Sequence, residues 1–321
     1  MTSFVTERLA CPRDHTALAA RGETLVCESG HEYPYVDGIP VLVVDDELEP
    51  TQPGYWSRPE QIEAVRRSVP PPIEGDGVDP YVAELIIGTH GNLYRGLARG
   101  LRRYPIPHFP LPSGAGKTLL DIGCNWGRWT ISAALAGYDP IGLDPSFEAI
   151  VAARRIAKQL GVHAHYAVAD ARRLPFPDDG FDVVFSYGVL QHFSKADVAV
   201  SAREIARVVA PEGYSWVQMP NAFGARNFYQ LARRRFREGD AFEVRYWTPD
   251  ELRRTFEQIG PTELRTDGFL TLNPQASDLD LLPGHLRVLV RGSELLRKAS
   301  EKVPALTTVA DSVNVRSVAR R

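Results

Sequence analysis

The most constraining feature of this chain is one continuous stretch, residues 119–144, which reads LLDIGCNWGRWTISAALAGYDPIGLD. An apolar run ends in Asp121, a turn containing Gly123 and Gly127 follows, and a helical segment leads to a second apolar run that ends in Asp144. Glycine lets the backbone of such a turn approach a ligand closely, and an acid after the second strand suits a ribose diol. The stretch therefore predicts a strand–helix–strand unit that binds a nucleoside.

The same turn disfavours a dinucleotide. The pyrophosphate fingerprint is G-x-G-x-x-G, whereas Cys124 and Asn125 follow Gly123 in this chain. The bulky Trp126 and Arg128 beside the turn also suit a ligand without a diphosphate better than NAD. A mononucleoside is the better interpretation.

Four ordered motifs within roughly residues 115 to 272 resemble those of the class I S-adenosylmethionine-dependent methyltransferases. The first motif of that family reads hydrophobic-hydrophobic-D-x-G-x-G-x-G, and this chain has Asn125 in place of the middle glycine. The other matching segments are residues 141–144, residues 167–171, and residues 181–186 with the following 187–193. An ordinary parallel-sheet core would also contain apolar runs, but packing alone does not require acids at successive strand ends. The resemblance implies a doubly wound, Rossmann-like α/β fold with a seven-stranded sheet.

The resemblance also implies which residues hold S-adenosylmethionine. Gly123 and Gly127 would flank the methionine part of the cofactor. Asp144 would hold the ribose hydroxyls, while Asp170 and Ala171 would face the adenine. The full set expected to bind the cofactor is Asp121, Gly123, Cys124, Asn125, Gly127, Asp144, Pro145, Asp170, Ala171, Ser186 and Tyr187.

Methyl transfer from a sulfonium is an in-line displacement, so positioning and a deprotonated acceptor provide most of the rate. If the acceptor is a hydroxyl, a general base within about 3 Å of it would help. We predict His192, just beyond the fourth strand, as that base, with Tyr187 shaping the pocket. The alternative is that His192 packs against the cofactor helix or caps the next helix.

Residues 1–45 follow a different pattern. They contain Cys11, the knuckle Cys27-x-x-x-His31 and the tail YPYVDGIPVL, and they resemble the small zinc-ribbon-like domain of methyltransferase activators. Paired C-x-x-C knuckles would bring four sulfurs to one tetrahedral zinc ion, but here Asp14 or His15 lies where a second sulfur is expected. The candidate ligand set is Cys11, Asp14, Cys27 and His31. A metal-free docking domain is the favoured interpretation.

The rest of the chain predicts the organisation around these two parts. Residues 46–79 read as a linker with weak helical character at 59–68, and residues 80–114 read as a capping helix leading into the catalytic domain. His90 and Tyr94 in that helix are candidates for cofactor contact. The catalytic domain is expected at 115–272, with a substrate lid or solvent-facing helix at 221–246, hairpin strands at 264–272, and a C-terminal helical extension at 273–321.

Composition limits the classes of function. No apolar run approaches the roughly 18 residues of a membrane span, and the start MTSFVTERLACP lacks a signal-peptide pattern, so we expect a cytoplasmic protein without a membrane span. The three cysteines agree with a reducing compartment. The net charge of −3 gives no general attraction to nucleic acid, although arginines gather within 226–237 and 95–103. Such runs are usually solvated, or they bind a phosphate or carboxylate of the substrate.

Three functions are compatible with the sequence. A methyltransferase acting on a small molecule, such as a sugar, a lipid-linked intermediate or a specialised metabolite, is favoured by the charge and the long insert, with O-methylation as the expected reaction. An RNA methyltransferase is the alternative, because ribosomal RNA guanine methyltransferases place a similar ribbon before the same fold. The missing cysteine and the absence of net positive charge argue against a nucleic-acid partner. The third function is a non-catalytic cofactor-binding scaffold, and a homodimer is also compatible with the sequence.

Overall fold

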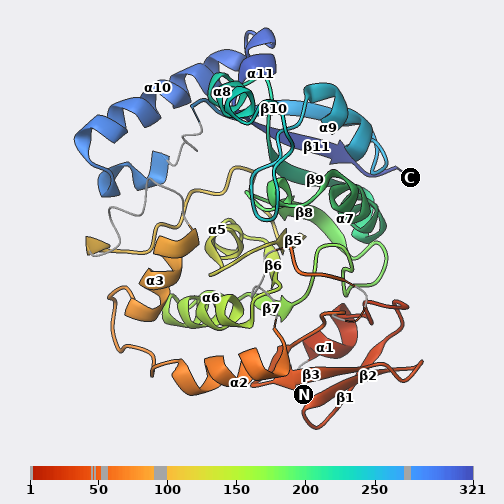
Figure 1. Cartoon of the computed structure of the whole chain (residues 1–321). Coiled ribbons are helices and arrows are strands. Elements are labelled where there is room, and N and C mark those ends of the chain that lie inside the picture. Colours follow the sequence, from red (N-terminus) through yellow and green to blue (C-terminus); the bar gives the residue numbers. More distant parts are fainter. Residues whose placement is uncertain are drawn as a thin grey trace. The chain divides into compact units, whose positions relative to one another are not determined.

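The computed structural model describes residues 3–44, 46, 48–51, 57–89, 100–270 and 276–320. It contains a seven-stranded mixed sheet, in the order β10-β11-β9-β8-β5-β6-β7, and a four-stranded antiparallel sheet, β1-β2-β3-β4 (Figure 1). The predicted doubly wound α/β fold with a small N-terminal β domain is confirmed. The chain divides into two compact units, Met1–Pro177 with Asp280–Leu282, and Asp178–Leu279 with Pro283–Arg321.

In the first unit the strands of the large sheet are parallel and apolar, as expected for strands with both faces covered. They and their helices are β5 Thr118–Ile122, α5 Arg128–Leu135, β6 Asp139–Asp144, α6 Phe147–Gln159 and β7 His165–Val168. The Ser146 hydroxyl caps α6 by accepting a hydrogen bond from the Ala149 N–H at 3.2 Å. The apolar stripe of α6, including Phe147, Ile150 and Ile156, is buried in the core of this unit.

The N-terminal part of this unit is α1 Ser3–Arg8, β1 Leu18–Arg21, β2 Thr24–Cys27, β3 Glu32–Val36 and β4 Ile39–Pro40, followed by α2 Pro59–Ser68 and α3 Pro80–Thr89. The helix expected at 59–68 is confirmed. The Leu42 N–H donates to the Val168 carbonyl at 2.7 Å, so the chain leaving β4 runs beside β7. Ile62 of α2 is buried in the same core as α6, which makes the predicted linker a packed segment. His90, Tyr94, Arg95 and Arg99 lie outside the described residues.

The second unit contains the other four strands and most of the later helices. They are β8 Phe181–Ser186, η2 Leu190–His192, α7 Lys195–Val208, β9 Val209–Pro220, α8 Ala225–Arg233, α9 Pro249–Phe256, β10 Thr262–Gly268, α10 Gly284–Ser300, α11 Ala305–Val309 and β11 Ser312–Val318; η3 Ala276–Leu281 lies between β10 and α10 in the chain. A capping box begins α9, because the Thr248 hydroxyl accepts from the Glu251 N–H and the Glu251 carboxylate accepts from the Thr248 N–H. Among the described residues, none of the helices combines the length and the apolar character needed to cross a bilayer.

The C-terminal segment corrects one sequence-based expectation. We expected the remaining hairpin strands within 264–272, but β10 ends at Gly268 and pairs with β11, Ser312–Val318, which lies between β10 and β9. The segment SVNVRSV alternates polar and apolar residues over one short run, a weaker signal than the helical pattern that precedes it. The C-terminal part therefore supplies a strand of the large sheet in addition to its helices.

Candidate functional site

Backbone hydrogen bonds hold the turn after β5 against the end of β6. The N–H groups of Gly123 and Cys124 both donate to the Leu143 carbonyl, at 2.7 and 2.9 Å. Gly123 and Gly127 have φ values of 75° and 83°, in the left-handed region that favours glycine. The sequence predicted a turn that requires glycine at both positions, and the backbone conformation of Gly123 and Gly127 agrees with this prediction.

Asn125 explains how the turn keeps its shape without the middle glycine of the family motif. Its φ is 48°, also left-handed, and asparagine is one of the side chains that tolerate this region best. The Asn125 side-chain oxygen accepts from the Trp126 N–H at 2.8 Å, and its own N–H donates to Asp144 Oδ2 at 2.9 Å. Asparagine thus preserves the backbone conformation and links the turn to the strand-end acid.

A pair of substitutions tests this role of Asn125. Asn125→Gly should leave the free energy of unfolding within about 1 kcal/mol of the wild type, because glycine adopts the same φ. Asn125→Val should lower it by about 1–3 kcal/mol, because a β-branched residue is strained there. Urea unfolding of both variants measures the difference. Equal stabilities would contradict the assigned conformation.

Asp121 and Asp144 are buried carboxylates at the ends of β5 and β6. Asp144 accepts from the N–H groups of Asn125 and Ser146, at 2.9 and 3.0 Å, and Asp121 Oδ2 accepts from the Thr130 hydroxyl at 2.7 Å. Burial raises the pKa of Asp144 to about 6. Burial, with a further contribution from the Asp144 charge, raises the pKa of Asp121 to about 7. Two desolvated acids at successive strand ends fit a ligand that offers hydroxyls and positive charge.

Asp170 has a partner that the sequence did not predict. Its two carboxylate oxygens accept from Nε and Nη2 of Arg172, both at 2.9 Å, and Nη2 also donates to the Glu49 carbonyl at 2.7 Å. This bidentate pair is buried, as is the neighbouring Ala171. An arginine two residues after an acid carries no recognisable motif, so only the structure reveals the pair. The predicted contact of Asp170 and Ala171 with adenine stays a prediction.

Cys124 and Pro145 lie beside these acids in packed positions. Cys124 is buried, and a Cβ added to Gly142 of β6 would come within 2.9 Å of its sulfur. The Pro145 carbonyl accepts from the Ser57 hydroxyl at 2.7 Å. Any contact of Cys124 with the cofactor would therefore use its backbone rather than its thiol.

In the second unit, the end of β8 meets a buried acid that sequence reasoning missed. Ser186 is buried, and the Tyr187 hydroxyl donates to Asp267 Oδ2 at 3.1 Å. The Ser312 hydroxyl donates to the same oxygen at 2.8 Å, and Asn314 Nδ2 donates to Oδ1 at 3.4 Å. Burial raises the pKa of Asp267. Asp267 reaches this position only because β10 and β11 pair antiparallel, with Gly268 opposite Ser312.

His192, the base predicted from the sequence, has both ring nitrogens engaged. Its Nδ1 lies 2.8 Å from the Phe242 carbonyl, and because a carbonyl only accepts, Nδ1 carries the proton. Its Nε2 then accepts from the Gln191 side-chain amide at 3.2 Å, and the ring stacks on Phe242 with centroids 3.9 Å apart. Burial lowers the pKa of His192. The imidazole is thus neutral, with its basic nitrogen held by Gln191.

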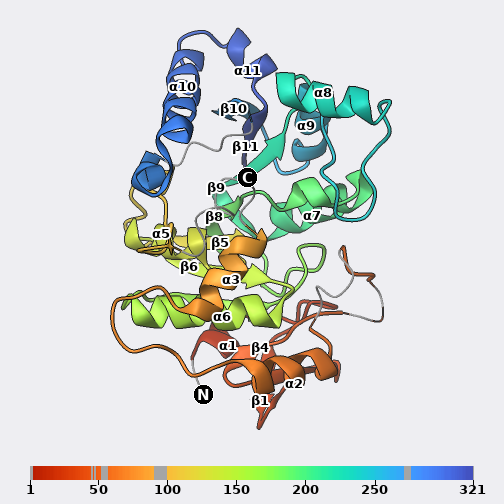
Figure 2. The same ribbon diagram turned by 60° about the vertical axis from the view of Figure 1, so that its left-hand side comes forward.

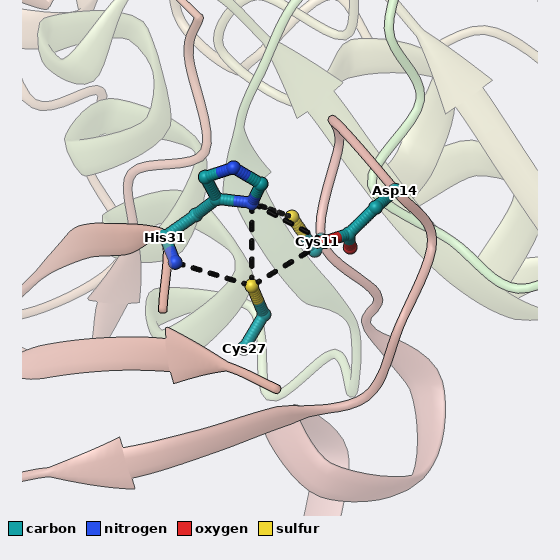
Figure 3. Close-up of side chains that lie close together, drawn as sticks. All are labelled: Cys11, Asp14, Cys27 and His31. Carbon is teal, nitrogen blue, oxygen red and sulfur yellow. Dashed lines mark hydrogen bonds and ion pairs between the residues drawn. The ribbon is translucent and has the colours of Figure 1, made fainter. Parts of the chain in front are cut away.

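The four candidate metal ligands of the N-terminal domain lie together (Figure 3). Their ligand atoms are all within 4.8 Å of one another, and Asp14 rather than His15 completes the group. His31 Nδ1 lies 3.4 and 3.3 Å from the sulfurs of Cys11 and Cys27, and 3.3 Å from Asp14 Oδ2. The Cys27 sulfur lies 3.7 Å from Asp14 Oδ2.

These distances and atom types fit a tetrahedral metal ion. Zinc bonds of about 2.3 Å to sulfur and about 2.0–2.1 Å to nitrogen or oxygen place neighbouring ligand atoms about 3.3–3.8 Å apart. The observed separations of 3.3 to 3.7 Å agree with that shell. Both cysteines are free thiols and are buried. Two sulfurs, one imidazole and one carboxylate are ligand types that zinc accepts.

Comparison of the sequence and the fold with known proteins indicates the family to which this site belongs. Residues 119–213 match a protein-family model described as a methyltransferase domain. A ubiquinone biosynthesis O-methyltransferase from Azorhizobium caulinodans is 35% identical over 106 residues, which are 33% of this chain and 41% of that protein. The YcgJ protein from Bacillus subtilis, a solved structure, is 21% identical with a TM-score of 0.43, covering 64% of this chain and 93% of its own.

A second protein with the name ubiquinone biosynthesis O-methyltransferase, from Sinorhizobium fredii, is 30% identical over 184 residues. This match covers 54% of this chain and 71% of that protein. The matches to the first curated relatives are shorter and span about two fifths of their length, 41% and 42%. The long match, the methyltransferase-domain match and the acids at the ends of β5 and β6 agree with one another. The chain belongs to the class I S-adenosylmethionine-dependent methyltransferases.

Proposed function

We propose that this enzyme transfers the methyl group of S-adenosylmethionine to a hydroxyl oxygen of a small molecule. The observation that carries the proposal is the buried carboxylate of Asp267, hydrogen-bonded to the Tyr187 hydroxyl directly after β8. A hydroxyl acceptor must lose a proton when its oxygen takes the methyl group, and this pair provides a place for that proton. The two relatives named above are O-methyltransferases, which supports the same choice of acceptor atom.

The residues of the first unit would bind the cofactor, which supplies an electrophilic methyl group on a positively charged sulfur. Gly123 and Gly127 allow backbone to approach the methionine part. The Asp144 carboxylate, which also accepts two backbone N–H groups, would accept from the ribose hydroxyls. The buried Asp121 would compensate part of the positive charge of the ligand.

In the second unit, the Tyr187 hydroxyl would accept the proton of the substrate hydroxyl while it donates its own proton to Asp267. The bound cofactor would supply the methyl group to the acceptor oxygen, and its sulfur would leave as a neutral thioether. Tyr187 would touch the acceptor, whereas Asp267 would act through Tyr187. His192 stays the alternative base, and it would first have to release the Gln191 amide.

The test is a transfer assay with methyl-labelled S-adenosylmethionine and two classes of acceptor, small phenols or catechols and bulk transfer and ribosomal RNA. We expect label in the small hydroxyl compounds and none in RNA. Label in RNA would overturn the proposal in favour of an RNA methyltransferase. Cofactor binding without label in any acceptor would overturn it in favour of a non-catalytic scaffold.

Cofactor affinity should increase with pH. A carboxylate binds hydroxyl hydrogens and a cation better when ionised, and the pKa of Asp144 in the ligand-free protein is about 6. We therefore expect S-adenosylmethionine to bind about tenfold more tightly at pH 8 than at pH 5 because of this group. Asp144→Asn should weaken binding at pH 8 by about 1.5–3 kcal/mol and remove the contribution of Asp144 to the pH dependence. Calorimetric titration gives both results, and an affinity unchanged by the substitution would contradict the ribose assignment.

Asp144 and Asp121 should make the ligand-free protein less stable as the pH rises, which is opposite to the trend expected for cofactor affinity. Their pKa values in the folded chain, about 6 for Asp144 and about 7 for Asp121, lie above those of an unfolded chain. The folded protein therefore binds more protons between about pH 4 and pH 7, and the contribution of these acids to stability is lost as the pH rises through that window. A bound cofactor would offset this loss.

We also infer that Cys11, Asp14, Cys27 and His31 hold a zinc ion. Four protein ligands would close the coordination shell, so the ion would support the folded domain rather than take part in methyl transfer. The ligand distances given above support this inference.

A further inference from the structure

The segment 223–242, which includes α8, presents its aromatic side chains to solvent. Asn227 is the buried residue of α8, and its Nδ2 donates to the carbonyls of Asn221 and Asp311 at 2.9 and 2.6 Å. The exposed aromatic residues are Phe223 at 49%, Phe228 at 51%, Tyr229 at 59%, Phe236 at 64% and Phe242 at 43% exposure. A helix on a globular protein normally buries its aromatic face and shows its amides, so this arrangement is reversed.

The exposed rings are grouped rather than scattered. Phe228 lies on α8 and Phe236 follows it in the chain, yet their ring centroids are 5.9 Å apart and the rings meet edge to face. The Arg233 guanidinium lies over the Tyr229 ring, 5.9 Å from its centroid. Single exposed apolar residues need no explanation, but a grouped set indicates a surface that something covers.

The charge of this segment indicates what covers it. Residues 223–243 contain five arginines, at positions 226, 233, 234, 235 and 237, and three acidic residues. The segment is therefore positively charged, in a chain whose net charge is −3. Arg234 pairs with Glu243 and Arg237 with Asp240, each at 3.4 Å, so part of this charge is balanced locally. Exposed aromatic rings together with arginines are the composition of a helix that lies in the interface of an anionic membrane.

A second helix extends this composition with aliphatic side chains. Figures 1 and 2 show α8, α10 and α11 at the same end of this unit, with α8 and α10 on opposite sides in Figure 2. Asn221, just before α8, donates to the Thr308 carbonyl of α11 at 2.8 Å. The exposed aliphatic residues of α10 are Val288 at 68%, Leu289 at 46%, Leu295 at 69% and Leu296 at 44% exposure. Aliphatic side chains enter hydrocarbon but do not stack on bases, which favours lipid over RNA as the partner.

We propose that this surface, α8 and residues 234–242, docks on an anionic lipid bilayer. The aromatic rings would lie at the boundary between headgroups and acyl chains, and the arginines would bind lipid phosphates. The attachment is peripheral, in keeping with helices that do not span a bilayer among the described residues. It does not depend on the acceptor of the methyl group.

Vesicle cosedimentation of the full chain tests the proposal. We expect binding to phosphatidylcholine vesicles that contain about one third phosphatidylglycerol, with affinity that falls at high salt. Two double variants, Phe228→Ser with Phe236→Ser and Arg235→Glu with Arg237→Glu, should each lower the affinity by at least about tenfold. The matched controls, Leu135→Ser at a residue 67% exposed on α5 and Arg21→Glu with Arg203→Glu at exposed positions, should bind as the wild type does.

Four outcomes would overturn the proposal. The first two are absence of binding to the anionic vesicles, and binding that the controls reduce as much as the α8 variants do. The third is that the wild-type protein binds RNA in a salt-dependent way but does not bind the vesicles, and that the arginine variant loses the RNA binding. The fourth is a dimer, seen by sedimentation equilibrium without lipid, that the phenylalanine variant dissociates. Calorimetric binding of S-adenosylhomocysteine by every variant establishes that each is folded, and the arginine variant alters only exposed side chains.

Discussion

Replacing Asp267 with asparagine should lower kcat by about 10²–10⁴-fold, the usual contribution of a positioned proton acceptor. Asparagine keeps the size of the side chain and its contacts with Tyr187 and Ser312, but it cannot take up a proton. S-adenosylmethionine affinity should stay within about twofold of wild type, because the acids assigned to the cofactor, Asp121, Asp144 and Asp170, lie on or just after β5, β6 and β7, and Asp267 lies on β10. Steady-state kinetics and calorimetry on the same preparations separate the two effects.

The pH profile distinguishes this role of Asp267 from a structural one. The acid limb of kcat should belong to Asp267, whose pKa is raised by burial, and should disappear in Asp267→Asn. Ser312→Ala removes one hydrogen bond to Asp267 but leaves the proton acceptor, so it is the matched control, with a loss of about tenfold or less expected. Tyr187→Phe should resemble Asp267→Asn. A larger loss in His192→Asn than in Asp267→Asn, with the acid limb unchanged in the latter, would transfer the role of base to His192.

Removing zinc from the N-terminal cluster should lower Tm by about 10 °C or more, because a structural ion binds the folded chain far better than the unfolded one. The purified protein should contain one zinc per chain by elemental analysis, and adding zinc after chelation should restore Tm. His31→Asn should reproduce the effect of the chelator and make the protein insensitive to it. His15→Asn, next to Asp14 but outside the cluster, should retain the ion.

A protein purified without zinc and unaffected by chelator would contradict this inference. The N-terminal domain would then rest on its apolar core, in which Leu18, Leu25 and Ile39 are buried. Its cysteines and His31 would be linked only by the hydrogen bonds that the cluster already contains. That result would match the metal-free interpretation favoured by the sequence.

The parts of the fold that follow from local patterns were predictable. The strand, turn and helix around Gly123 and Gly127 lie within one short stretch, and the two glycines indicate a turn that bulkier residues would not allow. The acids Asp121 and Asp144 end strands whose apolar runs are plain in the sequence. Parallel strands put their carboxyl ends at one edge of a sheet, which is why such acids indicate a ligand site.

The parts that depend on distant pairing were not predictable. Asp267 becomes a buried partner of Tyr187 only after β11 inserts between β10 and β9, and nothing near Asp267 in the sequence specifies that register. Asn125 looked like a departure from a glycine motif, although its left-handed φ gives the turn the backbone conformation that glycine would allow. The exposure of Phe228 and Phe236 was not predictable either, because a single sequence does not show which face of α8 is buried.

The most direct test of methyl transfer to oxygen is the product formed from a matched pair of acceptors, a catechol and the corresponding aromatic diamine. With wild-type enzyme and labelled S-adenosylmethionine, we predict that mass spectrometry will find the methyl ether of the catechol and no methylated amine. The Asp267→Asn enzyme should form about 10²–10⁴-fold less ether over the same time. Methylation of the diamine at an equal or greater rate, unaffected by Asp267→Asn, would contradict the proposed reaction.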